Sequence, residues 1–174
     1  LKSLAKNIIV DRTPEGLRIQ VVDQEGQPMF PLGSAEMPER TKLLMKKISQ
    51  VVAKLPNKIS ISGHTDAQPY RGAKGGHGNW ELSSDRALAS RRELVDSGLK
   101  SDRVLKVEGK AEMDPLVKDD PKSARNRRIS IVLLREANEA VAGQSGAGMP
   151  QTAEVPSSAK PRSFKRDWTG PRLR

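Results

Sequence analysis

The stretch ISISGHTD at residues 59–66, followed after a glycine-rich segment by NWELSSDRA at residues 79–87, decides the fold of this chain. Apolar and polar residues alternate at the start of the first segment, which predicts a β-strand with one buried face. The second segment begins a run of helical spacing that continues through Leu94. A strand therefore passes into a helix through a long polar loop, and such loops are often functional.

Asp66 and Arg86 lie on either side of this loop. If the strand and the helix meet there, a carboxylate and a guanidinium come together, which suits a ligand that carries both an ammonium and a carboxylate. A guanidinium offers a carboxylate two parallel hydrogen bonds, which a lysine does not. The plainer alternatives are that Asp66 caps the loop backbone and that Arg86 is an exposed helix charge.

A hairpin and a helix are predicted before this stretch. Residues 7–10 and 17–22 are apolar and β-branched, and the turn between them falls at residues 14–16. In the second strand, Arg18 and Gln20 alternate with the apolar residues, so we expect it to be half-buried. A helix is predicted from Pro38 in its first turn to Leu55, with an apolar face made of Leu43, Leu44, Ile48, Val51, Val52 and Leu55.

Two more strands are predicted after the central helix, which Ser97 and Gly98 end. They lie at residues 104–109 and 129–134, on either side of a second polar loop at residues 110–122. Strands that alternate with helices predict an α/β (α+β) two-layer sandwich, in which the helices pack on one face of the sheet. We expect a linker and first strand at residues 1–16, the folded domain at residues 17–136, and a disordered basic tail at residues 137–174.

The composition narrows the functional classes. The chain has 174 residues, a net charge of +10, no cysteine, 35% hydrophobic residues and 3% aromatic residues. These values predict one compact core with a substantial unfolded part, and they exclude a disulfide scaffold and thiolate metal sites. The positive charge favours anionic partners, namely nucleic acid, lipid surfaces or anionic cell-wall polymer. Because the chain begins at Leu1, we expect it to be a fragment of a longer protein.

Three separated motifs carry a family resemblance. They are GHTD at residues 63–66, NWELSSDRA at residues 79–87 and NRRISI at residues 126–131. In this order they resemble the signature of OmpA-like peptidoglycan-binding domains, which implies a mixed β-sheet with helices on one face. The segments ASRREL at residues 89–94 and QPMF at residues 27–30 are similar to the periplasmic domains of flagellar stator proteins of the MotB family.

The resemblance implies a set of peptidoglycan-binding residues. In OmpA-like domains, the residues that match Asp66 and Arg86 hold the two ends of the diaminopimelate side chain in the peptidoglycan stem peptide. The matches to Thr65, Asn79 and Arg127 complete the pocket, and Leu82 would supply its apolar wall by position. Alternation along the last strand sends Arg127 and Arg128 to opposite sides, so only one of them is expected to meet the ligand.

Other kinds of site are weaker explanations. Ser62, His64 and Asp66 suggest a hydrolase triad, but alternate residues of a strand lie roughly 7 Å apart, beyond a direct hydrogen bond. His64, Asp66 and His77 suggest a metal site, although two histidines across a loop are weak evidence. We instead expect His64 to form local hydrogen bonds that hold the loop. The glycine-rich segment lacks the Gly-Lys-Ser/Thr ending of a phosphate-binding loop.

The sequence and the resemblance together predict a module that is not an enzyme and has no cofactor or metal. It would anchor a flagellar motor stator to peptidoglycan so that the motor generates torque. We expect it to be the periplasmic domain of a single-pass inner-membrane protein, a homodimer, and a partner of a MotA-type stator subunit through an absent membrane segment. The alternative is an OmpA-like wall anchor of another envelope complex or lipoprotein. Nucleic acid is not expected as a partner, since no recognised motif is present.

Overall fold

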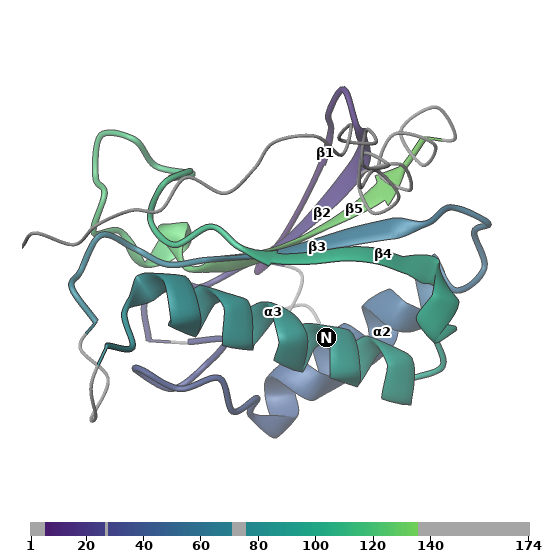
Figure 1. The fold of residues 1–174 in the computed structure, drawn as a ribbon, viewed down its shortest axis with the longest axis horizontal. Coiled ribbons are helices and arrows are strands. Elements are labelled where there is room, and N and C mark those ends of the chain that lie inside the picture. The colour runs from purple at the N-terminus through teal and green to yellow at the C-terminus, as the bar shows by residue number, and fades with distance from the viewer. Residues whose placement is uncertain (1–5, 27, 71–75, 136–174) are drawn as a thin grey trace, which may run out of the picture.

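The computed structural model describes residues 6–26, 28–70 and 76–135 (Figure 1). Five strands form one sheet in the order β1-β2-β5-β3-β4. Their bounds are β1 Ile8–Arg12, β2 Gly16–Val22, β3 Ile59–His64, β4 Val104–Gly109 and β5 Arg128–Leu134. Strands β3 and β4 are parallel, and the other neighbouring pairs are antiparallel, so the sheet is mixed. The predicted division into domains stays a prediction, and the predicted tail lies outside the described residues.

In the described part of the chain, two α-helices, α2 Glu39–Val52 and α3 Asn79–Asp96, cover one face of the sheet (Figure 1). Helix α3 begins after Gly78, whose N–H donates to the Glu81 carboxylate at 2.7 Å, and it is followed by Gly98 with a φ of 106°. Two short 3₁₀ turns, η1 Ser101–Arg103 and η2 Ala124–Asn126, precede β4 and β5. The predicted two-layer α/β sandwich is therefore confirmed.

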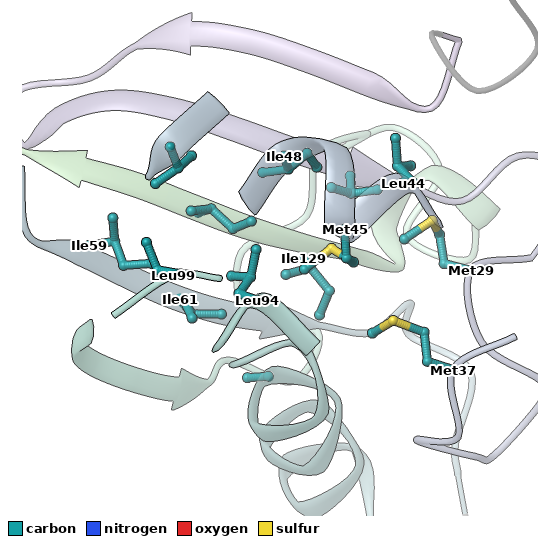
Figure 2. Close-up of a cluster of buried hydrophobic side chains, with 14 of the residues drawn as sticks. Met29, Met37, Leu44, Met45, Ile48, Ile59, Ile61, Leu94, Leu99 and Ile129 are labelled. Atoms are coloured by element: carbon teal, nitrogen blue, oxygen red, sulfur yellow. The ribbon is translucent and has the colours of Figure 1, made fainter. Parts of the chain in front are cut away.

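The hydrophobic core lies between the helices and the sheet (Figure 2). Strand β5 lies in the middle of the sheet, and all seven of its residues are buried. The largest fully buried apolar side chains are Met45, Ile59, Ile61, Leu94, Leu99, Ile129 and Ile131. Burial of each such side chain contributes on the order of 1.5–3 kcal/mol. The strands and α3 are thus held in a fixed relation to one another.

The apolar face predicted for α2 is partly wrong. Leu43 and Val51 are 57% and 59% exposed, and Leu55 lies beyond the helix end at 39%. The buried stripe instead includes Thr41 and Ser49, because their hydroxyls donate to the backbone carbonyls of Met29 and Leu94 at 2.9 and 2.8 Å. Within the described ranges, no helix is both long and apolar enough to cross a lipid bilayer.

The half-buried character predicted for the second strand also needs correction. Gln20 of β2 is buried, because Arg128 of β5 lies across it and donates from Nε to Gln20 Oε1 at 2.8 Å. Arg18, on the same side of the strand, forms an ion pair with Asp11 of β1. The polar side of β2 is therefore covered by paired side chains.

Candidate functional site

The candidate site lies at one end of the sheet, and the topology explains its composition. Strands β2 and β3 both run antiparallel to β5, so their carboxyl ends lie beside the amino end of β5, at one end of the sheet. The register places Val22 and His64 opposite Arg128. The next residues, Asp23 and Thr65 with Asp66, therefore lie beside Arg127. Helix α3 begins at the same end of the sheet (Figure 1).

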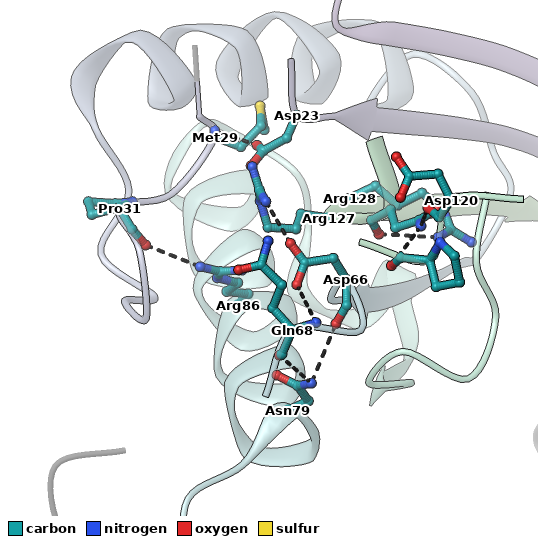
Figure 3. A network of polar contacts seen from close by, with 12 residues as sticks. Asp23, Met29, Pro31, Asp66, Gln68, Asn79, Arg86, Asp120, Arg127 and Arg128 are labelled. Carbon is teal, nitrogen blue, oxygen red and sulfur yellow. Dashed lines mark hydrogen bonds and ion pairs between the residues drawn. The ribbon is translucent and has the colours of Figure 1, made fainter. Parts of the chain in front are cut away.

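Asp66 is paired with Arg127 in this structure. Arg127 Nη1 donates to Asp66 Oδ2 at 2.6 Å, and the backbone N–H of Gln68 donates to Asp66 Oδ1 at 3.1 Å (Figure 3). Asp66 is buried, whereas the Arg127 side chain keeps 24% of its surface exposed. Among the described residues, no hydrogen bond joins Asp66 to Arg86. Asp66 and Arg86, the predicted acid and base, therefore influence each other electrostatically without direct contact.

Asp23 is a second carboxylate of this network, and sequence reasoning missed it. Its Oδ2 accepts from Arg127 Nε at 2.8 Å, and its Oδ1 accepts from the Met29 N–H at 2.5 Å. Burial raises the pKa of Asp23, and the hydrogen bond from Arg127 opposes this shift. Burial also acts to lower the pKa of Arg127, but the bonds to Asp23 and Asp66 outweigh it and raise that pKa. The signal available in the sequence was that Asp23 directly follows an apolar strand, as Asp66 nearly does.

Arg86 is buried on α3 and holds the segment that leads into α2. Its Nε donates to the Ser34 carbonyl at 2.9 Å. Its Nη2 donates to the Pro31 carbonyl at 3.1 Å (Figure 3). Its guanidinium carbon lies 5.1 Å from the centre of the Phe30 ring, which is cation–π distance. Burial lowers the pKa of Arg86, while Asp23 counteracts the shift. Nη1 of Arg86 has no hydrogen-bond partner in the part of the chain that the structure describes.

The remaining predicted residues line the same region. Asn79 Nδ2 donates to the carbonyls of Asp66 and Gln68 at 3.4 and 3.1 Å, which ties the loop after β3 to the start of α3. Thr65 is buried, and its hydroxyl has no hydrogen-bond partner among the described residues. Leu82 is buried one turn into α3. The structure thus brings all six predicted site residues to one end of the sheet.

Asn126 explains how Arg127 reaches its place. Asn126 is fully buried, and its side-chain amide accepts from the Val117 N–H at 2.7 Å and donates to the carbonyls of Val117, Asp120 and Pro121. These bonds fasten the preceding polar loop to the turn that enters β5. Arg128 points away from the site, to Gln20 and to Asp114 at 3.2 Å, so the predicted divergence of the two arginines is confirmed.

The structure also bears on the two alternative sites, a hydrolase triad and a metal site. Ser62 Oγ donates to Glu108, and His64 Nε2 lies 3.4 Å from Ser130 Oγ on β5, so the strand residues form no triad with Asp66. His64 therefore contacts the neighbouring strand, and the expectation that it holds the loop is wrong. Burial lowers the pKa of His64 to about 3, so its ring is neutral at pH 7. The described residues contain no group of three His, Asp or Glu side chains that suits a metal.

Two cavities adjoin these residues. A narrow cavity of about 10 Å³ lies behind the network, between Asp23, Arg86 and Arg127, and it is too small for a ligand. A larger hollow of about 490 Å³ is lined by Arg12, Arg18, His64, Lys110 and Ser130 among others, and its lining includes none of the six predicted site residues. Arg127, whose side chain is 24% exposed, is the residue of the network that is most open to solvent.

The network combines two carboxylates with two guanidiniums, so its formal charges balance. A ligand with one positive and one negative group leaves this balance unchanged, whereas a simple cation or anion adds an uncompensated charge next to buried groups. The arrangement offers charge-assisted hydrogen bonds of both kinds.

Comparison with known proteins identifies the family to which the chain is similar. The model of the OmpA family matches residues 29–128. Motility protein B of Escherichia coli strain K12 is 44% identical over 142 residues, which are 81% of this chain and 46% of that protein. Motility protein B of Bacillus subtilis strain 168 is 30% identical over 136 residues, which are 76% of this chain and 51% of that protein. The chain thus spans about half the length of these curated relatives.

Solved structures show the same fold. The periplasmic domain of Helicobacter pylori MotB has a TM-score of 0.64 and 19% identity, with 79% of this chain and 94% of that chain covered. The cell wall anchor of the T6SS from Pseudomonas aeruginosa has a TM-score of 0.64 and 23% identity, with 76% and 90% covered. At these identities the likeness concerns the fold.

Proposed function

The chain belongs to the OmpA family, and on this premise we propose that it is a non-enzymatic peptidoglycan-binding module that anchors a flagellar motor stator to the cell wall. The observation that carries the proposal is the charge-balanced network of Asp23, Asp66, Arg86 and Arg127 at the end of the sheet. The stator role is supported by the 44% identity to Motility protein B of E. coli.

The ligand is the diaminopimelate side chain of the stem peptide, whose distal carbon carries an ammonium and a carboxylate. Asp66 accepts hydrogen bonds from the ammonium, and the two arginines receive the carboxylate. Arg86 has Nη1 available for this role, and Arg127 has its exposed side. Thr65 adds a buried hydroxyl that has no partner in the described part of the chain. Asn79 holds the loop, and Leu82 forms the apolar wall.

The function is mechanical. A module that tethers the stator to the cell wall resists force and does not convert a substrate. The chain would be the periplasmic part of a single-pass inner-membrane protein and would act as a homodimer. A MotA-type stator subunit would join it through a membrane segment. A motility assay in a stator-deletion strain separates this role from that of a wall anchor in another envelope complex, because only the stator restores swimming.

The binding itself is tested by co-sedimentation with purified diaminopimelate-type peptidoglycan. The full chain should sediment with the polymer, and the Asp66→Ala variant should remain in the supernatant. Asp114→Ala is the matched control, because it removes an arginine-paired carboxylate outside the network. Equal binding of the Asp66→Ala variant and the wild type at physiological salt would contradict the proposed pocket and leave only charge attraction.

A further inference from the structure

Arg127 is held by two carboxylates from distant parts of the chain. Asp66 follows β3, and Asp23 follows β2, and both accept hydrogen bonds from the same guanidinium (Figure 3). We propose that Asp23 is a positioning residue of the binding pocket, which keeps Arg127 in place when a ligand ammonium takes its share of Asp66. This inference rests on the proposed function, because it concerns the same pocket.

Asp66 is a poor sole anchor for Arg127. An ammonium that binds Asp66 competes with Arg127 Nη1 for Oδ2, since Oδ1 already accepts the Gln68 N–H. If Arg127 had only this partner, an ammonium at Asp66 would weaken the one side-chain contact that fixes the orientation of a partly buried guanidinium. Asp23 removes this conflict, because its bond to Nε uses another edge of the guanidinium. Arg127 then keeps one carboxylate whether or not Asp66 is occupied.

Asp23 is itself fixed independently of Asp66. Its backbone N–H donates to the Arg127 carbonyl at 3.0 Å, which extends the β2–β5 pairing by one residue. Its Oδ1 accepts the Met29 N–H, and its side chain is only 3% exposed. Two donors, the Met29 N–H and the Arg127 Nε–H, thus hold this carboxylate before any ligand arrives, which is the preorganisation that a binding site needs.

The Asp23 carboxylate also supports Arg86 indirectly, through the segment that begins at Met29. Met29 begins the segment that supplies the Pro31 and Ser34 carbonyls to Arg86. Asp23 therefore orients Arg127 directly and supports the segment that orients Arg86. No other described side chain hydrogen-bonds both to Arg127 and to this segment.

The decisive experiment is a double-mutant cycle on the full chain, titrated by calorimetry with a soluble muropeptide that contains diaminopimelate. Asp23→Asn should weaken binding by about ten- to a hundredfold, the range expected for a lost charge-assisted hydrogen bond. In an Arg127→Gln background the same substitution should change the dissociation constant by less than about twofold, because an asparagine oxygen still accepts the Met29 N–H and only the contact with Arg127 is lost. A general structural defect would instead persist in that background.

Two controls separate the possible failures. Asp114→Asn removes the carboxylate partner of the neighbouring Arg128 and should bind as the wild type does. If the wild type does not bind the muropeptide, the proposed function fails. If the wild type binds and Asp66→Ala does not, but Asp23→Asn binds normally, only the role of Asp23 is overturned. An undiminished effect of Asp23→Asn in the Arg127→Gln background overturns it as well.

A second measurement keeps the inference testable if Asp23→Asn does not fold. In the Asp66→Asn variant, the Arg127 Nε–H should still exchange slowly with solvent in ¹⁵N NMR spectra, because its acceptor is Asp23. The signal is assigned by its absence in Arg127→Gln. Exchange as fast as that of the exposed Arg92 would show that Asp66 is the anchor, and it would overturn the proposal.

Discussion

Gly63 of β3 lies so close to Ser83 of α3 that a Cβ added to the glycine would be 2.0 Å from the Ser83 carbonyl oxygen. On the neighbouring strand, a Cβ at Gly109 would lie 2.2 Å from Ser84 Oγ. Because these two glycines have no side chains, the first turns of α3 pack directly against the backbone of β3 and β4. Asn79 and Leu82 thereby come next to the loop that carries Asp66.

Gly63→Ala should destabilise the protein by about 1–3 kcal/mol or more, because the methyl group overlaps a backbone atom that has no freedom to move alone. Denaturant unfolding followed by circular dichroism measures the change. Gly78→Ala is the matched control, since its Cβ would meet its nearest neighbour at 3.6 Å, an ordinary contact. Equal stability of Gly63→Ala and the wild type would show that the helix does not need this close approach.

Much of the fold was predictable from residue periodicity. The alternation at residues 59–62 and the helical run after Asn79 correspond to β3 and α3. Periodicity failed for α2, where it placed Leu43 and Val51 inside and overlooked Thr41 and Ser49. Small hydroxyl side chains are tolerated in a core when they donate to nearby carbonyls, and those carbonyls belong to distant segments. Such tertiary partners are not visible in a local pattern.

The site was predictable only where a motif marked it. Asp66 and Arg86 were predicted from their spacing and the family resemblance, and Asn79 and Arg127 from the resemblance alone. Asp23 was missed, because its partner Arg127 lies 104 residues away and the pairing depends on β2 and β5 being neighbours. The carbonyls that hold Arg86 were missed for a similar reason, since a backbone acceptor leaves no mark in the sequence.

The low pKa of His64 makes the protein sensitive to acid. The unfolded chain takes up a proton near pH 6.5, whereas the folded chain resists it until about pH 3. Between these values the unfolded state binds more protons, so the free energy of unfolding falls as pH falls, by at most about 1.4 kcal/mol per pH unit. His64→Gln, which removes this proton uptake, should lose less stability between pH 7 and pH 4.

Urea unfolding at both pH values measures this difference. The two proteins share their other titrating groups, so the comparison isolates the histidine. His77→Gln controls for the loss of a histidine as such, because His77 is exposed. Parallel loss of stability in the wild type and in His64→Gln would mean that the His64 ring becomes protonated in the folded protein without cost.

Arg86→Lys should lower stability as well as ligand binding. A lysine ammonium cannot reproduce the planar pair of bonds to the Pro31 and Ser34 carbonyls, and it loses the stacking over Phe30. The expected loss is about 1.5–3 kcal/mol, the contribution typical of hydrogen bonds made by a charged group. Urea unfolding measures it, with Arg92→Lys on the exposed side of α3 as the control. An unchanged midpoint would show that the carbonyls are satisfied without the guanidinium.

The last prediction concerns the chemistry of the wall. Diaminopimelate presents an ammonium and a carboxylate on its distal carbon, and a charge-balanced network needs both. Lysine, which takes this place in other walls, has the ammonium alone, and amidated diaminopimelate has lost the carboxylate charge. The arginines then lack their ligand partner, which costs roughly 1.5–3 kcal/mol, or about ten- to a hundredfold in affinity.

Co-sedimentation with purified walls of the three kinds tests this directly. The chain should bind diaminopimelate-type wall well and the lysine-type and amidated walls poorly, at the same ionic strength. Salt separates this specificity from general attraction between a chain of net charge +10 and an anionic polymer, since raising the salt weakens the general attraction on all three walls. The preference for diaminopimelate should therefore grow sharper as salt increases. Equal retention on all three walls at every salt concentration would contradict recognition of the zwitterion, because binding would then not depend on the ligand carboxylate.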